Sequence, residues 1–260
     1  MSKPAADALF HIGASGLMST AIQTATLIVV LVVLTLLARG RVHFGRLALA
    51  VIATAIMTFA LSVHFPRWEN AVLAQFGVAH GQWNWDGKIV SILATLVLIA
   101  VIPRVSFKDC GFRWSQNGGI VAGLLGGALI CAFVWGSNYF VGAPNHATGE
   151  TLWYEATLPG LQEEPSFRGL MLLLLNQAFK DKPITLLGAP IGWGAVASSV
   201  YFGMGHGLGW DNGRIVFDAL TILLTGAIGF VLLWIRERTG SLILPILAHN
   251  ASNFGTYLFF

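Results

Sequence analysis

Six polar residues that could take part in hydrolysis lie within otherwise apolar stretches of the C-terminal half of this sequence. They are Glu163, Glu164, Arg168, His206, His249 and Asn253. A charged residue costs on the order of 2.5–3.5 kcal/mol inside a membrane segment, so the few that occur there usually serve a function. Carboxylates and imidazoles transfer protons, and side-chain N–H groups stabilise a developing oxyanion. The set therefore predicts an active site that uses water inside a membrane.

The first three of these residues are close in sequence, and their spacing suggests separate roles. Arg168 follows Glu164 by four residues, which is one helical turn, so the two should form an ion pair. Pro165 suits the first turn of a helix, which predicts that a new helix begins near the two glutamates. Glu163 would then face a substrate or water. The ordinary alternative is a buried ion pair beside a glutamate at a wet interface.

The two histidines lie on different apolar segments. His249 and Asn253 are four residues apart and should share a helix face, about 12 Å below Ser241. Interhelical hydrogen bonding is the ordinary role of such a pair, and a neighbouring helix is the expected partner of Asn250. His206 ends another apolar segment, and Phe202 one turn earlier either packs in the core or orients the imidazole.

Zinc is the alternative to a metal-free mechanism. Two imidazoles, a carboxylate and an open position make a catalytic zinc site, and Glu163, His206 and His249 would supply these ligands. Asparagine is a poor zinc ligand, however, and the sequence has no HExxH pair. We therefore expect no metal cofactor, with zinc as the alternative.

The segments that carry these residues predict an all-α membrane protein. Hydrophobic residues make up 55% of the 260 residues and charged residues 10%, against about 25% charged in an ordinary soluble domain. Eight stretches approach the roughly 20 apolar residues that a spanning helix needs, if Lys88 snorkels at one end of the third. They are residues 18–38, 47–65, 84–102, 119–141, 158–179, 186–207, 214–235 and 241–260. We expect one polytopic domain over residues 1–260, a bundle of about eight transmembrane helices with a polar intramembrane cavity.

Basic residues predict the orientation of the bundle. One set of alternate loops contains Arg39, Arg41, Arg46, Arg104, Lys108, Arg113, Lys180, Lys182, Arg236 and Arg238, whereas the other contains Lys3, Arg67, Lys88 and Arg214. The first set should be cytoplasmic, which puts both termini outside and the catalytic cavity in the outer half of the bilayer. The net charge of +3 is thus explained by topology, and we expect the lipid bilayer but no nucleic acid as a partner. Cys110 and Cys131 lack metal-ligand spacing and predict no disulfide framework.

Three motifs within residues 158–260 resemble those of a known family. They are EExxxR at Glu163, Glu164 and Arg168, FxxxH at Phe202 and His206, and HxxxN at His249 and Asn253. Together and in this order they resemble the CPBP family of CAAX proteases and bacteriocin-processing enzymes, which includes the Ras-converting prenyl-protein endopeptidase and the bacterial Abi proteins.

The resemblance implies an intramembrane endopeptidase that cleaves a membrane-associated peptide or protein. Glu163 and His206 would activate water, His249 and Asn253 would stabilise the oxyanion, and Glu164, Arg168 and Phe202 would support them. Members are widely labelled metalloproteases. We expect a multi-pass protein of a bacterial plasma membrane. The alternatives are a proton-coupled transporter, for which the sequence lacks an internal repeat, and a catalytically silent scaffold or immunity protein.

Overall fold

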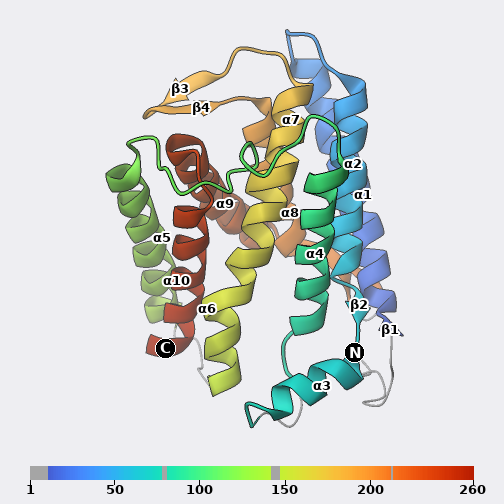
Figure 1. Cartoon of the computed structure of the whole chain (residues 1–260), viewed down its shortest axis with the longest axis vertical. Helices are drawn as coiled ribbons and strands as arrows, with labels where there is room; N and C mark the ends of the chain where they lie inside the picture. The colour runs from blue at the N-terminus through green and yellow to red at the C-terminus, as the bar shows by residue number, and fades with distance from the viewer. Residues whose placement is uncertain (1–10, 78–80, 142–146, 212) are drawn as a thin grey trace.

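The computed structural model describes residues 11–77, 81–141, 147–211 and 213–260, and most of these residues are helical (Figure 1). Three helices in this described part are long and apolar enough to cross a membrane: α1 (Ala14–Leu37), α5 (Ile120–Val141) and α9 (Ala219–Thr239). Large apolar side chains on their outer surfaces, such as Val29, Leu125 and Leu223, are exposed, as expected where lipid replaces water. The chain is therefore an integral membrane protein.

Shorter helices pack among these three. They are α2 (Phe44–Ala60), α4 (Trp85–Val101), α8 (Trp193–Gly207) and α10 (Ile243–Phe259). A further helix, α3 (Pro66–Ala74), lies across one end of the assembly and was not predicted (Figure 1). Pro66 occupies its first turn, where a missing N–H leaves no hydrogen bond unmade.

Two of the predicted spanning segments begin as hairpins instead of helices. Residues 186–207 were predicted to span, but β3 (Ile184–Leu186) and β4 (Ala189–Ile191) pair antiparallel before α8 begins. A turn at Leu187 and Gly188, both with positive φ, breaks the helix there. Residues 214–235 likewise begin in β6 (Arg214–Phe217), which pairs with β5 (Leu208–Asp211). A third antiparallel pair joins β1 (His11–Ile12) to β2 (Val63–His64), which are separated in the chain by α1 and α2.

One continuous helix carries the two glutamates. It comprises α6 (Gly149–Glu163), the π-helix η1 (Glu164–Met171) and α7 (Leu172–Ala178), and it lies between α4 and α10 (Figure 1). The prediction that a new helix begins at the glutamates is therefore wrong. The π-helix accommodates Pro165 within the chain of turns, and the Leu172 N–H donates to the carbonyl of Phe167, five residues back. The glutamates thus lie at the midpoint of a long continuous helix.

Close packing holds the α6–η1–α7 helix and its neighbours in place. Leu170, Met171, Leu174 and Leu175 are fully buried in the main core cluster. On the other side of the molecule, a Cβ atom on Gly123 would come within 2.6 Å of Leu244 Cδ1 and one on Gly127 within 3.1 Å of Ala248 Cβ, so α5 packs closely against α10 at these glycines. Gly123 and Gly127 are four residues apart, so they lie on the same face of α5.

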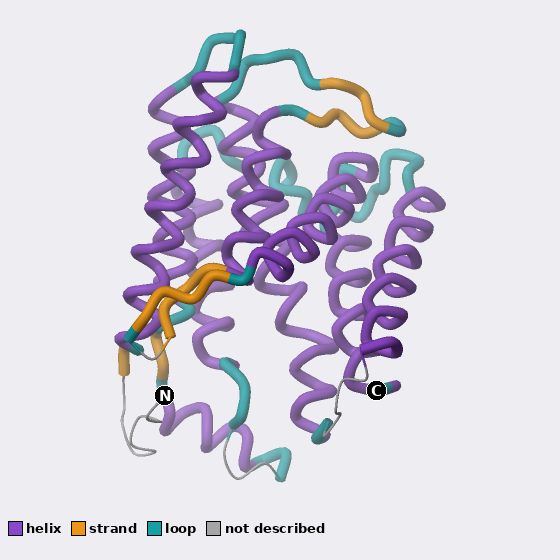
Figure 2. The backbone as a smooth tube through the Cα atoms, turned by 180° about the vertical axis from the view of Figure 1, so that it is seen from behind, coloured by secondary structure: helices purple, strands orange, loops and turns teal. Residues whose placement is uncertain are grey.

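The basic loops gather at one end of the helices. The connections from α1 to α2, α4 to α5, α7 to β3 and α9 to α10 lie together, and β1 and the end of α10 lie at the opposite end (Figure 1). Seen from behind, α8 ends about halfway along the assembly, and the β5–β6 hairpin that follows runs against α1 (Figure 2). His206 lies near the end of α8, and its side chain is 37% exposed.

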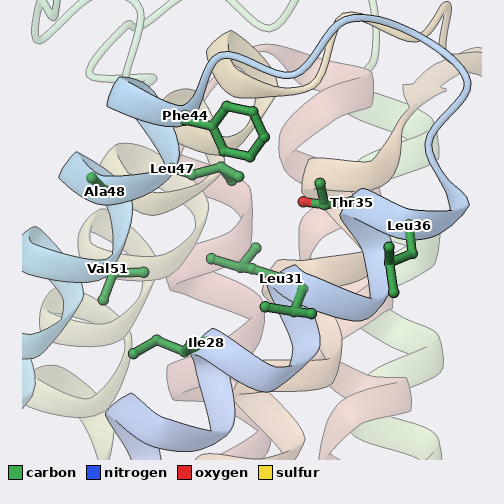
Figure 3. Close-up of a pocket in the computed structure, with 9 residues that line it drawn as sticks. Ile28, Leu31, Thr35, Leu36, Phe44, Leu47, Ala48 and Val51 are labelled. Carbon is green, nitrogen blue, oxygen red and sulfur yellow. The ribbon is translucent and has the colours of Figure 1, made fainter.

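An apolar groove of about 320 Å³ lies between α1 and α2 (Figure 3). Leu31, Leu36, Phe44 and Leu47 are among its lining residues, and Thr35 is the single polar one. None of the six polar residues that could support hydrolysis lines it, so any active site must lie elsewhere in the molecule.

Candidate active site

Five of the six predicted residues form one linked cluster where α6, η1, α8 and α10 meet. Glu163 and Glu164 come from the junction of α6 and η1, His206 from α8 and His249 from α10. Glu163 Oε2 lies 3.8 Å from the Nε2 atoms of both His206 and His249. Residues separated by up to 86 positions in sequence therefore surround a single carboxylate oxygen.

Glu164 anchors the buried side of the cluster. Its Oε1 atom accepts hydrogen bonds from Arg168 Nη1 at 3.1 Å and from His249 Nδ1 at 2.7 Å. Glu164 and Arg168 are almost completely inaccessible, and the predicted ion pair between them is present. Arg168 also donates to the Gly229 carbonyl at 3.1 Å and lies 3.8 Å above the Phe202 ring. Such a pair orients a histidine more than it stabilises the fold.

The hydrogen bonds of the two imidazoles assign their tautomers. His206 Nδ1 lies 2.8 Å from the Phe202 carbonyl, which can only accept, so this nitrogen carries the proton and Nε2 has its lone pair toward Glu163. His249 Nδ1 donates to the Glu164 carboxylate, so its Nε2 carries a proton only in the imidazolium form. The Phe202 ring lies 4.5 Å from the His206 ring and restricts its rotation.

Glu163 has one satisfied oxygen and one without a partner. Oε1 accepts from Lys88 Nζ of α4 at 2.6 Å. Oε2 is buried and makes no hydrogen bond to the described residues, although most buried polar atoms are paired. The 3.8 Å gaps to the imidazoles of His206 and His249 are too long for direct hydrogen bonds and suit a bridging water. The three groups thus define a place for a water molecule.

Asn253, the sixth predicted residue, has a different neighbour. Its Nδ2 atom donates to Glu155 Oε2 at 2.9 Å, one turn beyond His249 on α10. Asn250 bonds to the neighbouring helix, as predicted, through the Gly160 N–H at 2.7 Å and the Thr157 carbonyl at 3.0 Å. These backbone groups flank Pro159, which interrupts the hydrogen bonds of α6. Asn250 therefore fastens α10 to α6 beside the cluster.

Sequence reasoning missed three residues of this site: Lys88, Glu155 and Gln162. Lys88 was interpreted as a snorkelling residue, but its ammonium points between the helices, to Glu163 and to Gln162 Oε1 at 3.4 Å. A signal was present in the spacing, because Lys88, Ser91 and Thr95 fall on one face of α4. A polar stripe on an apolar helix indicates a polar partner.

The geometry does not fit a zinc ion held by Glu163, His206 and His249. Tetrahedral ligands about 2.0–2.1 Å from zinc lie roughly 3.3 Å apart, whereas Glu163 Oε2 is 3.8 Å from each imidazole nitrogen. The Lys88 ammonium on the same carboxylate would face the metal with a like charge. Within the described ranges, no group of three or more His, Cys, Asp or Glu side chains has the arrangement of a metal site. The alternative zinc site is therefore not supported.

Comparison with known proteins agrees with the three sequence motifs. Residues 150–255 match the family model described as type II CAAX prenyl endopeptidase Rce1-like. The match includes all six predicted residues, whereas Lys88 lies outside it. No curated protein and no solved structure matches the chain.

Proposed function

The chain contains an Rce1-like domain of the CPBP family of intramembrane proteases, and from this premise we propose that it hydrolyses a peptide bond in a membrane-associated peptide or protein, with Glu163 as the general base. One observation carries the proposal. Glu163 Oε2 is buried, unpaired and 3.8 Å from two imidazole nitrogens, which suits a water molecule held for attack.

In the proposed reaction the water donates its hydrogens to Glu163 Oε2 and His206 Nε2. The carboxylate takes one proton as the water oxygen bonds to the peptide carbonyl carbon. When the tetrahedral intermediate collapses, the C–N bond breaks and that proton passes to the departing amine. His206 suits its role because its Nδ1–H is held by the Phe202 carbonyl, which leaves Nε2 as the acceptor.

His249 and Asn253 are the proposed donors to the oxyanion. His249 would act as an imidazolium, because Nδ1 already donates to Glu164 and only the charged ring offers a second N–H. Asn253 donates one amide hydrogen to Glu155, and its second amide hydrogen would donate to the substrate. Glu164 and Arg168 then support catalysis by fixing the His249 ring, and Phe202 by fixing His206.

The substrate would approach through a cavity of about 830 Å³ between α3, α4 and α6. Its lining includes Phe76, Trp85 and Trp153, which suit an apolar segment of a membrane-associated substrate. Thr157, also in the lining, is six residues before Glu163 on α6, so this cavity lies about 9 Å along the helix from the base.

The Glu163→Gln substitution tests this proposal. It removes the proton acceptor while keeping an oxygen that can accept from Lys88, so kcat should fall roughly 10²- to 10⁴-fold with the fold intact. The assay is cleavage of a membrane peptide library by purified protein in detergent. Glu237→Gln, at a half-buried glutamate near the end of α9, serves as the matched control and should retain activity. Full activity in Glu163→Gln would remove this residue as the base, and ion flux without cleavage would favour a transporter.

A metal-free mechanism also predicts the effect of chelation. Because the donor spacing and Lys88 disfavour zinc, cleavage should be unchanged after treatment with 1,10-phenanthroline and dialysis. Elemental analysis of the same preparation provides the check. Stoichiometric zinc whose removal abolishes cleavage, and whose return restores it, would contradict the mechanism.

A further inference from the structure

We propose that Lys88 of α4 is a positioning residue of the active site, which holds Glu163 ionised and directs Glu163 Oε2 toward His206 and His249. The inference rests on the proposed function of Glu163. It adds to the site a residue from outside the matched family domain, since Lys88 precedes residue 150 by more than sixty positions.

The contact that carries the inference is short and protected. Lys88 Nζ lies 2.6 Å from Glu163 Oε1, and both side chains are 13% exposed. A lysine that only snorkelled would extend toward the aqueous interface, away from the helix interior. Because Oε1 is occupied by the ammonium, Oε2 alone remains to accept a proton from water.

Among the charged groups around Glu163, Lys88 is the one that can keep this carboxylate ionised. Its charged and titratable neighbours are Lys88, Tyr154, Glu155, Glu164, Arg168, His206 and His249. Arg168 and His249 both donate to Glu164, so they are already paired. His206 is the neutral tautomer in the proposed mechanism. The Lys88 ammonium is therefore the cation in direct contact with the Glu163 carboxylate, which burial would otherwise drive toward its neutral form.

The rest of α4 is built to keep Lys88 in register. Gln162 Nε2 donates to Ser91 Oγ at 3.0 Å, and Thr95 Oγ1 lies 2.9 Å from Ser166 Oγ. These bonds join the stripe of Lys88, Ser91 and Thr95 to Gln162, directly before the two glutamates, and to Ser166, two residues after them. Ser91 in turn donates to the Met57 carbonyl of α2 at 2.9 Å. These hydrogen bonds fix α4 against its neighbours, and this limits the positions that the Lys88 ammonium can reach.

Kinetics of Lys88 variants test the inference. Lys88→Met should lower kcat at least tenfold with KM within about twofold of wild type, since the ammonium does not touch the substrate. The acid limb of the pH–rate profile should move to higher pH, because loss of the cation favours the protonated carboxyl. Lys88→Arg should restore much of kcat, and Lys182→Met on an exposed loop is the control. Wild-type kcat and an unchanged pH profile in Lys88→Met would overturn the inference.

A double-mutant cycle tests the pair without using activity. Lys88→Met leaves a buried carboxylate without its cation and should lower the thermal midpoint by about 5–10 °C. Adding Glu163→Gln removes that carboxylate, so the double variant should unfold above Lys88→Met alone. Additive effects would overturn the pairing. If the two substitutions are coupled but the wild-type protein cleaves no peptide, the result would support the pairing and refute the proposed function.

Discussion

Arg168 is a buried charge whose contacts connect several parts of the proposed site. Its guanidinium is 1% exposed and is surrounded by Glu164, the Gly229 carbonyl and the Phe202 ring. The planar group reaches all three at once, which a compact ammonium cannot do. Through Glu164 it also fixes the ring of His249, so it links fold stability to the proposed oxyanion site.

Removal of this guanidinium should unfold the protein more readily. Arg168→Met leaves Glu164 buried and without its guanidinium partner, and should cost about 3–5 kcal/mol of unfolding free energy. Arg168→Lys should recover only a part. Thermal unfolding in detergent measures both variants, with the exposed Arg104→Met as control. A midpoint within 1 °C of wild type for Arg168→Met would contradict this account.

At the same scale, helical spacing predicted some contacts and missed others. The Glu164–Arg168 pair followed from a separation of four residues on one helix. Lys88 and Glu155 contact Glu163 and Asn253 across helix interfaces, and no spacing within one segment indicates which helices become neighbours. The chemical roles of these residues can be predicted from their side-chain types, but their partners depend on how the helices pack.

Among the elements, the π-helix η1 has the clearest influence on the site. It adds a residue to the turn that follows Glu163, and one residue corresponds to about 100° around a helix. Without it, the side chains on either side of Pro165 would point in other directions. Such π segments often occur at functional sites, and here one separates Glu163 from the Arg168 network.

Pro165→Ala should therefore separate stability from activity. The restored N–H allows regular α-helical hydrogen bonds, so stability should stay equal or rise, whereas cleavage should fall at least tenfold as Glu164 and Arg168 rotate away. Pro159→Ala is the matched control, since Asn250 already satisfies the backbone there. Unfolding midpoints and cleavage rates of both variants give the readout. Wild-type activity in Pro165→Ala would show that the π-helix is dispensable.

Hydropathy predicted the helices better than their ends. Each of the eight apolar segments contains a helix, and three of these helices, α1, α5 and α9, are long and apolar enough to cross a membrane. The β3–β4 hairpin was missed because its residues, Ile184 to Ile191, are at least as apolar as those of α8. The β5–β6 hairpin was missed because the apolar residues Ile215, Val216 and Phe217 run directly into α9. The turn at Leu187 and Gly188 was the local signal.

For the whole molecule, the distribution of basic residues predicts how the protein is inserted. With the basic loops at one end and both β1 and the end of α10 at the other, the positive-inside rule puts the termini outside the cytoplasm. Plasma membrane insertion in this orientation would expose the cavity that contains Trp153 to the extracytoplasmic side.

Cysteine labelling on intact cells checks this orientation. A membrane-impermeant maleimide should modify Ala147→Cys directly and Lys108→Cys only after permeabilisation, in a Cys131→Ser background. Cys110 can stay, because its thiol is fully buried and burial raises its pKa to about 12, which keeps it protonated and unreactive at neutral pH. The reverse labelling pattern would invert the topology.

The polar stripe on α4 has a consequence for how this protein can be divided. Fragments restricted to residues 150–255 would present Gln162, Glu163 and Ser166 to hydrocarbon, where each unpaired group is costly. Excision of residues 150–255 should therefore give an insoluble, inert product. The proposed active site depends on two packed helices, and one of them, α4, lies outside the matched residues.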